Sequence, residues 1–313
     1  MAEKLKNAFL VRGSTPKSTA KAYLYLFPAL LILSVFSFYP AIRGIMMAFY
    51  TEYTVVGGFT PISTGFDNFV YVFNDPLFIR AIRNTFVFVI GVVPATVILS
   101  LLIAMLLNAK IKGASVYRAI YFLPNVTSIV AVAIVWNWIY HSQFGILNNF
   151  LGFFGIDPRP WLLHPDYAMT ALIIMSIWRS LGFAIVVLLA GMQTINNDLY
   201  RAAKIDGANL WHRTMTVTIP MLSPTLFFVS IISVISSFRV FSEVFALFAQ
   251  GGQAGLTAGP ANSVMTAVFY IFMMFNQNWR FGVASAAATV LFVIIFIFTM
   301  IQMYVGKKLV HYK

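Results

Sequence analysis

Charged and hydroxyl-bearing side chains within the apolar parts of this sequence are few, and several gather in one run. Arg239 and Glu243 lie four residues apart, which on a helix is close enough to pair. The same run carries hydroxyls and an aromatic ring, on Ser233, Ser236, Ser237 and Phe238. Such groups can bind a polar, hydroxylated solute. The alternatives are that the charges only satisfy each other or anchor the helix near the outer leaflet, that the serines serve helix packing, and that Phe238 faces lipid.

Three more residues are candidates for the same solute path. Trp178 interrupts another apolar run just before Gly182, where it could line a cavity or fill a bundle. Tyr270 and Asn276 lie in a segment that we expect on the outer side, dipping back toward the cavity. Beside Trp178, Arg179 is the main unpaired cation if Arg239 is matched by Glu243.

Machinery for catalysis or metal binding is not visible in the sequence. The chain has no Cys, and its four His residues show no ligand spacing. The motifs H-E-x-x-H, G-x-S-x-G and G-x-x-x-x-G-K-[ST] are all missing. We therefore expect a protein that is not an enzyme and binds no cofactor. If ATP drives it, the ATPase must be another chain.

Composition predicts an all-α integral membrane protein. Of the 313 residues, 60% are hydrophobic and 10% charged, and the mean hydropathy is +0.84, more apolar surface than a soluble domain can bury. Runs of roughly 20 apolar residues can cross the ~30 Å hydrocarbon core, and without period-2 alternation they read as helices. Six such spans are predicted, at Tyr23–Met47, Thr85–Leu107, Ala119–Tyr140, Met169–Ala190, Pro224–Phe248 and Phe281–Val305.

The placement of the positive charges predicts the orientation. The net charge of +12 could indicate nucleic acid, but most of the 21 Lys and Arg fall in the tails and in alternate loops. By the positive-inside rule, tails 1–22 and 306–313 are cytoplasmic, flanking a membrane domain over 23–305. We expect no nucleic-acid partner and no cleaved signal peptide, since the first apolar run is too long and has no cleavage site.

A polar, patterned stretch, "DLYRAAKIDGANLWHRTMTVTIPML", lies between the fourth and fifth predicted spans. Leu199, Ala202, Ala203 and Asp206 share one face of a short helix, and Gly207 permits a sharp break. A second short helix can follow before Pro220 and Pro224 mark the next span. We expect a cytoplasmic helix-turn-helix with a knob of small residues that inserts into a partner; the alternative is a solvated loop.

The stretch resembles the E-A-A loop of permease subunits of binding-protein-dependent ABC importers, in which E-A-A, three residues and G precede I-x-L-P by about nine residues. The matching positions are Ala202, Ala203, Asp206, Gly207, Ala208, Ile219 and Pro220. Arg201 stands where the family usually has Glu, which affects any salt bridge carried over from that position. "GFDNFVYVFNDPLFIRAIRNT" and "FGVASAAATVLF" also resemble the maltose-type sugar permeases, so the likeness covers nearly the whole chain.

The resemblance implies a type I importer permease in a prokaryotic cell membrane. Its partners would be a second homologous permease, two ATPase subunits that bind ATP and Mg²⁺, and an external solute-binding protein. The loop at about 194–223 would be the coupling helix, and the Gly-rich stretch Ala249–Asn262 an outer loop that either docks the binding protein or only connects helices. The cargo would be a sugar or oligosaccharide; the alternatives are a glycerol phosphate or, in another class, an ion-coupled secondary transporter. That class predicts inverted repeats and midplane carboxylates, which we do not detect.

Overall fold

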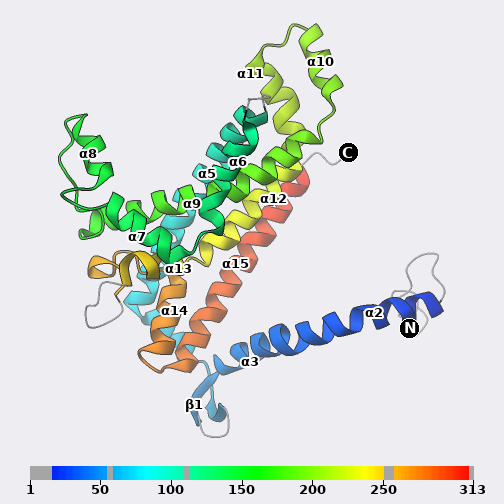
Figure 1. The fold of residues 1–313 in the computed structure, drawn as a ribbon. Coiled ribbons are helices and arrows are strands. Elements are labelled where there is room, and N and C mark those ends of the chain that lie inside the picture. Colours follow the sequence, from blue (N-terminus) through cyan, green and yellow to red (C-terminus); the bar gives the residue numbers. More distant parts are fainter. Residues whose placement is uncertain (1–15, 55–58, 109–112, 250–256, 310–313) are drawn as a thin grey trace.

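The computed structural model describes residues 16–54, 59–108, 113–249 and 257–309, and these are helical apart from one β-hairpin (Figure 1). The first half contains α2 (Pro16–Leu33), η1 (Ser34–Phe38), α3 (Tyr39–Met47), β1 (Tyr50–Thr54), β2 (Thr60–Thr64), α4 (Asp67–Asn74), α5 (Pro76–Asn108), α6 (Ala114–Val126), α7 (Ile129–Ile139) and α8 (Ile146–Gly152). The second contains α9 (Pro165–Gln193), α10 (Asn197–Ile205), α11 (Leu210–Arg213), η2 (Thr214–Thr218), α12 (Ile219–Phe238), α13 (Ser242–Val244), η3 (Phe245–Ala249), η4 (Pro260–Asn262), α14 (Ala267–Asn276) and α15 (Phe281–Leu309). Residues 1–15 of the basic amino-terminal tail and 250–256 of the Gly-rich stretch lie outside the described residues.

Five helices among the described residues are long and apolar enough to cross a membrane, or six if one bent pair forms a single span. α5, α9 and α12 pack on one another, and α15 packs against α12 and α14 (Figure 1). Their apolar faces form clusters around Leu172, Leu188 and Phe238. Long helices satisfy their own backbone groups, which lipid cannot do, so this bundle is suited to a bilayer.

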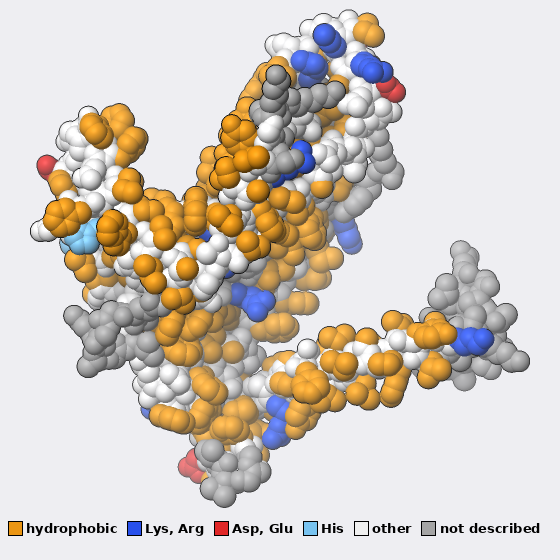
Figure 2. All heavy atoms as spheres, in the orientation of Figure 1, with side chains coloured by type: hydrophobic (Ala, Val, Ile, Leu, Met, Phe, Trp, Pro, Cys, Tyr) orange, Lys and Arg blue, Asp and Glu red, His pale blue; other side chains and the backbone are white. Residues whose placement is uncertain are grey.

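The first apolar helix stands apart from this bundle. α2, the π-helical turn η1 and α3 run on as one candidate span, Lys21–Met47, whose most apolar stretch is entirely unburied. α3 packs against α15, while α2 extends away from the other helices with apolar side chains along its length (Figures 1 and 2). An apolar surface of this size must be covered by lipid or by another chain.

The third predicted span is wrong as a straight helix. α6 and α7 meet at 103°, with Thr127 and Ser128 extended between them. Pro124 lacks an N–H and weakens the last turn of α6, which allows the break. Asn125, Thr127 and Ser128 interrupt the apolar run at the bend, but the run of about 20 residues counted as a span averages over this interruption, so its overall hydropathy did not locate the break.

The fifth predicted span is also wrong at both ends. α11, η2 and α12 form one continuous helix from Leu210 to Phe238, so the second arm of the polar loop leads straight into the membrane helix. α12 stops at Phe238, ten residues before the predicted end, and the short elements α13 and η3 follow. At the break, the Thr266 hydroxyl donates to the Val240 carbonyl at 3.0 Å, which satisfies a backbone acceptor in an apolar setting.

The end of the bundle opposite α10 and α11 is closed by smaller elements (Figure 1). β1 and β2 form an antiparallel hairpin with Tyr50 opposite Thr64, beside α4. The Asn68 amide, on α4, donates to the carbonyls of Ala48 and Tyr50 at 3.1 and 2.9 Å, tying the hairpin to the helix. Beyond α7, α8 projects to one side (Figure 1).

Gly182 sets how closely α9 approaches α6, because a Cβ atom there would collide with the Tyr121 carbonyl. Gly182→Ala should therefore force these helices apart and lower the free energy of unfolding by about 1–3 kcal/mol. The measurement is the Tm of the detergent-solubilised protein. Gly152→Ala is the matched control, since a Cβ atom at Gly152 meets nothing within 4 Å. Equal Tm values for the two variants would contradict this packing.

Candidate substrate cavity and cytoplasmic docking loop

A cavity of about 270 Å³ lies among α5, α6, α9, α12 and α13, beside the α6–α7 bend and the end of α12. At the α6–α7 bend and at the end of α12 the helices are interrupted, which leaves space within the apolar bundle. The lining combines apolar and aromatic groups with hydroxyls, one amide and two charges. The lining residues are Phe88, Val92, Thr96, Asn125, Ser176, Arg179, Ser180, Phe183, Ile232, Ser233, Ser236, Ser237, Val240 and Glu243.

An ion pair crosses this cavity wall. The Arg179 guanidinium on α9 donates to Oε1 of Glu243 on α13 at 2.6 Å. Their side chains are 29% and 17% exposed. The predicted pairing of Arg239 with Glu243 is therefore wrong: α12 ends at Phe238 and α13 begins at Ser242, so the two residues do not share one helix, and Arg239 is exposed.

Three polar atoms on the cavity residues lack a hydrogen-bond partner within the described structure. They are the Thr96 Oγ1, the Ser176 Oγ and the Arg179 Nε, all buried from solvent. A buried polar atom without a partner costs free energy, so such atoms normally bind water or a ligand. The wall also carries the Asn125 amide and further serine hydroxyls, which can donate to and accept from a polar occupant.

The polar loop at the other end of the bundle is a helix-turn-helix, as its pattern predicts. Gly207 has φ +79°, its N–H donates to the Lys204 carbonyl at 3.2 Å, and the Ala208 N–H donates to the Ala203 carbonyl at 2.9 Å. These two bonds are those of a Schellman motif, which ends a helix with glycine in the left-handed region. Asn209 then caps α11, its side chain accepting from the His212 N–H at 2.8 Å.

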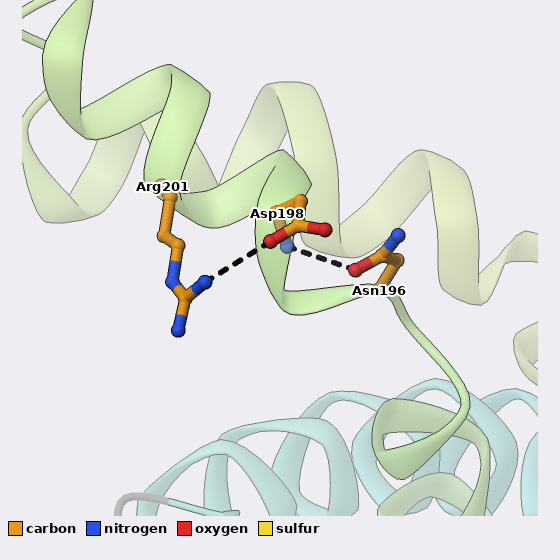
Figure 3. A network of polar contacts seen from close by, with 3 residues as sticks. All are labelled: Asn196, Asp198 and Arg201. Carbon is orange, nitrogen blue, oxygen red and sulfur yellow. Dashed lines mark hydrogen bonds and ion pairs between the residues drawn. The ribbon is translucent and has the colours of Figure 1, made fainter.

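Arg201 is held on the surface of α10. Its guanidinium donates to Oδ1 of Asp198 at 3.2 Å, and the Asp198 N–H donates to Asn196 Oδ1 at 2.9 Å, capping the helix (Figure 3). The Arg201 and Asp198 side chains are 79% and 71% exposed, so this pair contributes little to stability. Because it is so exposed, the Arg201 guanidinium is accessible on the surface of α10.

Large apolar side chains are exposed where α10 turns into α11. Ile205, Leu210 and Trp211 are 86%, 74% and 70% exposed. They lie outside the apolar bundle, where exposed side chains of a loop are usually polar. Lys and Arg side chains gather over the same end of the molecule (Figure 2). Ala203, Gly207 and Ala208 line a groove of about 420 Å³ between the two arms. Exposed apolar groups beside a groove are typical of a protein interface. Sequence reasoning did not single out Ile205, Leu210 and Trp211, although apolar residues in an otherwise polar loop were an available signal.

Residues 77–311, most of the chain, match the family described as the binding-protein-dependent transport system inner membrane component. The chain belongs to this family. The prediction of a multi-pass membrane transport subunit, rather than an enzyme, is confirmed by this membership. It also favours an importer subunit over an ion-coupled secondary transporter.

Relatives extend the match to nearly the full length. The lactose transport system permease protein LacF of Rhizobium radiobacter is 36% identical over 309 residues, covering 95% of this permease and 99% of LacF. A crystal structure of a bacterial ABC transporter that imports the acidic polysaccharide alginate matches with TM-score 0.76 and 25% identity, over 94% of the permease and 98% of that chain. A second structure, of a bacterial alginate transporter with an alginate pentasaccharide-bound periplasmic protein, gives 0.76 and 26%, over 93% and 96%. The predicted all-α type I permease fold is confirmed.

The structure brings four of the predicted path residues of the permease to the cavity: Ser233, Ser236, Ser237 and Glu243. Sequence reasoning did not place Thr96, Asn125, Ser176 and Ser180 there. Thr96 and Asn125 are single polar residues on separate helices, whereas Ser176 and Ser180 lie four residues apart on α9, a spacing that was an available signal. Arg179 was noticed only as an unpaired cation.

The other five predicted path residues do not line the cavity. Phe238, the last residue of α12, points into the bundle. It is 1% exposed and its ring packs against the rings of Phe86 and Phe298. The Trp178 ring instead makes a T-shaped contact with the Trp136 ring, with the two ring centroids 5.6 Å apart. Arg239 is exposed just beyond the end of α12, and Asn276 is exposed as the last residue of α14. Tyr270 is buried elsewhere.

Tyr270 joins two elements of the permease. Its hydroxyl donates to Oδ2 of Asp75 at 2.6 Å, linking α14 to the start of α5, where the Leu77 N–H donates to Asp75 Oδ1. Burial raises the pKa of Tyr270, and the Asp75 carboxylate raises it further, so the phenol remains a neutral donor. Tyr270 is thus a structural residue.

Tyr270→Phe should lower the free energy of unfolding of the permease by about 1.5–3 kcal/mol, the value of a hydrogen bond to a charged group. The measurement is the Tm in detergent, in a double-mutant cycle with Asp75→Asn. The double variant should lose no more than Asp75→Asn alone. Additive losses would show that the two side chains do not interact in the permease.

Proposed function

We propose that the chain is a transmembrane permease subunit of an ATP-driven importer whose cargo is a sugar or oligosaccharide. The observation that carries this proposal is the membrane-embedded cavity with five serines, a threonine and an asparagine on its wall. Sugars present many hydroxyls and an apolar ring face, which such hydroxyls and the half-buried Phe183 can match. LacF belongs to a lactose transport system, and the related solved transporter imports alginate, both carbohydrates.

The loop at about 194–223 couples transport to ATP hydrolysis on separate ATPase subunits, which bind ATP and Mg²⁺. Its support is the exposed apolar tip and the groove lined by small residues. In this proposal Arg201, Ala202, Ala203, Asp206, Gly207, Ala208, Ile219 and Pro220 form the docking loop. Because α11 continues through η2 into α12, a displacement of the loop is transmitted along one continuous helix to Ser233, Ser236 and Ser237 at the cavity.

Two further partners complete the importer. A second homologous permease covers the apolar first helix, which has no buried residues in its most apolar stretch. A solute-binding protein docks on the outer face, as a periplasmic protein is present in the second alginate structure. Both tails, 1–22 and 306–313, are cytoplasmic, with the docking loop on the same side. Cargo would enter the cavity when the two permease subunits open outward. It would leave when ATP hydrolysis returns them to the inward-facing state.

The cargo is tested by uptake into membrane vesicles that contain the intact importer, with its binding protein added. Labelled lactose and a mixture of labelled neutral oligosaccharides should accumulate only with ATP inside the vesicles. Labelled glycerol 3-phosphate is the matched competitor. Accumulation of glycerol 3-phosphate alone would replace the carbohydrate proposal with the glycerol-phosphate alternative.

Gly207→Val should uncouple ATP hydrolysis from uptake. The left-handed backbone at φ +79° costs a β-branched residue roughly 1–2 kcal/mol, so the turn between α10 and α11 would open. The expected result is loss of cargo-stimulated ATP hydrolysis with the permease still in the membrane. Gly207→Asn is the control, because Asn tolerates this conformation and should retain coupling. Normal uptake by Gly207→Val would contradict the coupling role of the loop.

A further inference from the structure

The cavity carries no net charge. Among its lining residues Arg179 is the basic one and Glu243 the acidic one, and they pair at 2.6 Å. The remaining polar groups are hydroxyls and one amide, which are neutral at physiological pH. An occupant therefore meets dipoles and one compensated ion pair.

This balance depends on the break at the end of α12. Had the helix continued as its composition predicts, Glu243 would lie one turn beyond Arg239 and pair with it. Because α12 ends at Phe238, Glu243 instead reaches α9, while Arg239 is exposed outside the cavity. The geometry thus commits Glu243 to Arg179.

We propose that Glu243 determines the charge selectivity of the cavity, which by its pairing with Arg179 accepts an uncharged polyhydroxy cargo and disfavours an anionic one. The inference rests on the proposed function, in that the cavity is taken as the path of the solute. A carboxylated or phosphorylated cargo needs a cation without a partner, because a desolvated anion is costly unless it is paired. Arg179 could supply one only by giving up Glu243.

The likeness to an importer of acidic alginate does not decide this point. A fold match at 25% identity leaves the charges of the lining groups open. The charge of the cargo depends on which side chains meet in this cavity, and here a carboxylate faces the one guanidinium.

The absence of cysteine from the sequence allows a direct test. Ser236→Cys places one thiol at the cavity, in the intact complex purified in mild detergent. Two methanethiosulfonates of similar size, one with an anionic sulfonatoethyl group and one with a cationic trimethylammonioethyl group, label this thiol. Mass spectrometry of the 35.0 kDa chain gives each rate, and the cysteine-free parent gives the blank.

The informative quantity is the ratio of the anionic to the cationic labelling rate, divided by the same ratio for 2-mercaptoethanol. A change in thiol ionisation alters both rates equally and cancels. With the Arg179–Glu243 pair intact, the normalised ratio should be close to one. Adding Glu243→Gln uncovers Arg179, and the ratio should rise on the order of tenfold, since a charge at this range in a protein acts with that strength.

Three control variants separate the charge effect from damage to the fold. Arg179→Gln should shift the ratio on the order of tenfold in the opposite direction. The double variant with Glu243→Gln should return it to near one. Arg239→Gln removes the arginine that lies nearest to Glu243 in the sequence but outside the cavity, and should leave the ratio unchanged.

Equal ratios for Glu243→Gln, Arg179→Gln and the parent would overturn the inference. So would an Arg239→Gln shift as large as that of Arg179→Gln, or failure of both reagents to reach the Ser236→Cys thiol. Labelling requires neither cargo nor ATP, so its failure is distinct from failure of the uptake assay, which tests the carbohydrate importer itself.

Discussion

The arrangement of this permease depends on how charged and polar groups are satisfied inside an apolar bundle. A lone guanidinium or carboxylate in such surroundings is costly, and the pairing of Arg179 with Glu243 offsets part of that cost for both. The pair also fixes α13 against α9 after α12 has ended. This one electrostatic contact stabilises the cavity wall beside the α6–α7 bend and the end of α12. The serines of α12 that line the cavity remain available to a solute.

The interruptions and the long helices have complementary roles. The α6–α7 bend and the end of α12 create the cavity, whereas the unbroken helix from Leu210 to Phe238 connects that cavity to the docking loop. A rigid helix can transmit a movement of the loop over its whole length. Broken helices beside the cavity can change shape at low cost, because their ends lack regular backbone hydrogen bonds.

The sequence predicted what depends on composition and local geometry. The apolar runs located the spans, and the Ala-Ala and Gly207 pattern predicted the helix-turn-helix that Schellman bonds close. It could not predict the end of α12, because residues 237–242 contain neither Gly nor Pro and further apolar residues follow up to Phe248. That one error assigned Glu243 to Arg239, since a pairing between distant helices is invisible in residue spacing. Phe238 and Tyr270 were misplaced for the same reason: which face of a helix meets a cavity depends on tertiary packing.

The central claim is that the α10–α11 loop is the docking site of an ATPase. The most direct measurement is purification of this chain from its native membrane in mild detergent, followed by mass spectrometry of the proteins that accompany it. The account predicts a second permease and an ATPase with a P-loop, with the ATPase lost and the second permease retained when Ala203 is replaced by Arg. A chain that purifies alone and moves solute without ATP would contradict it.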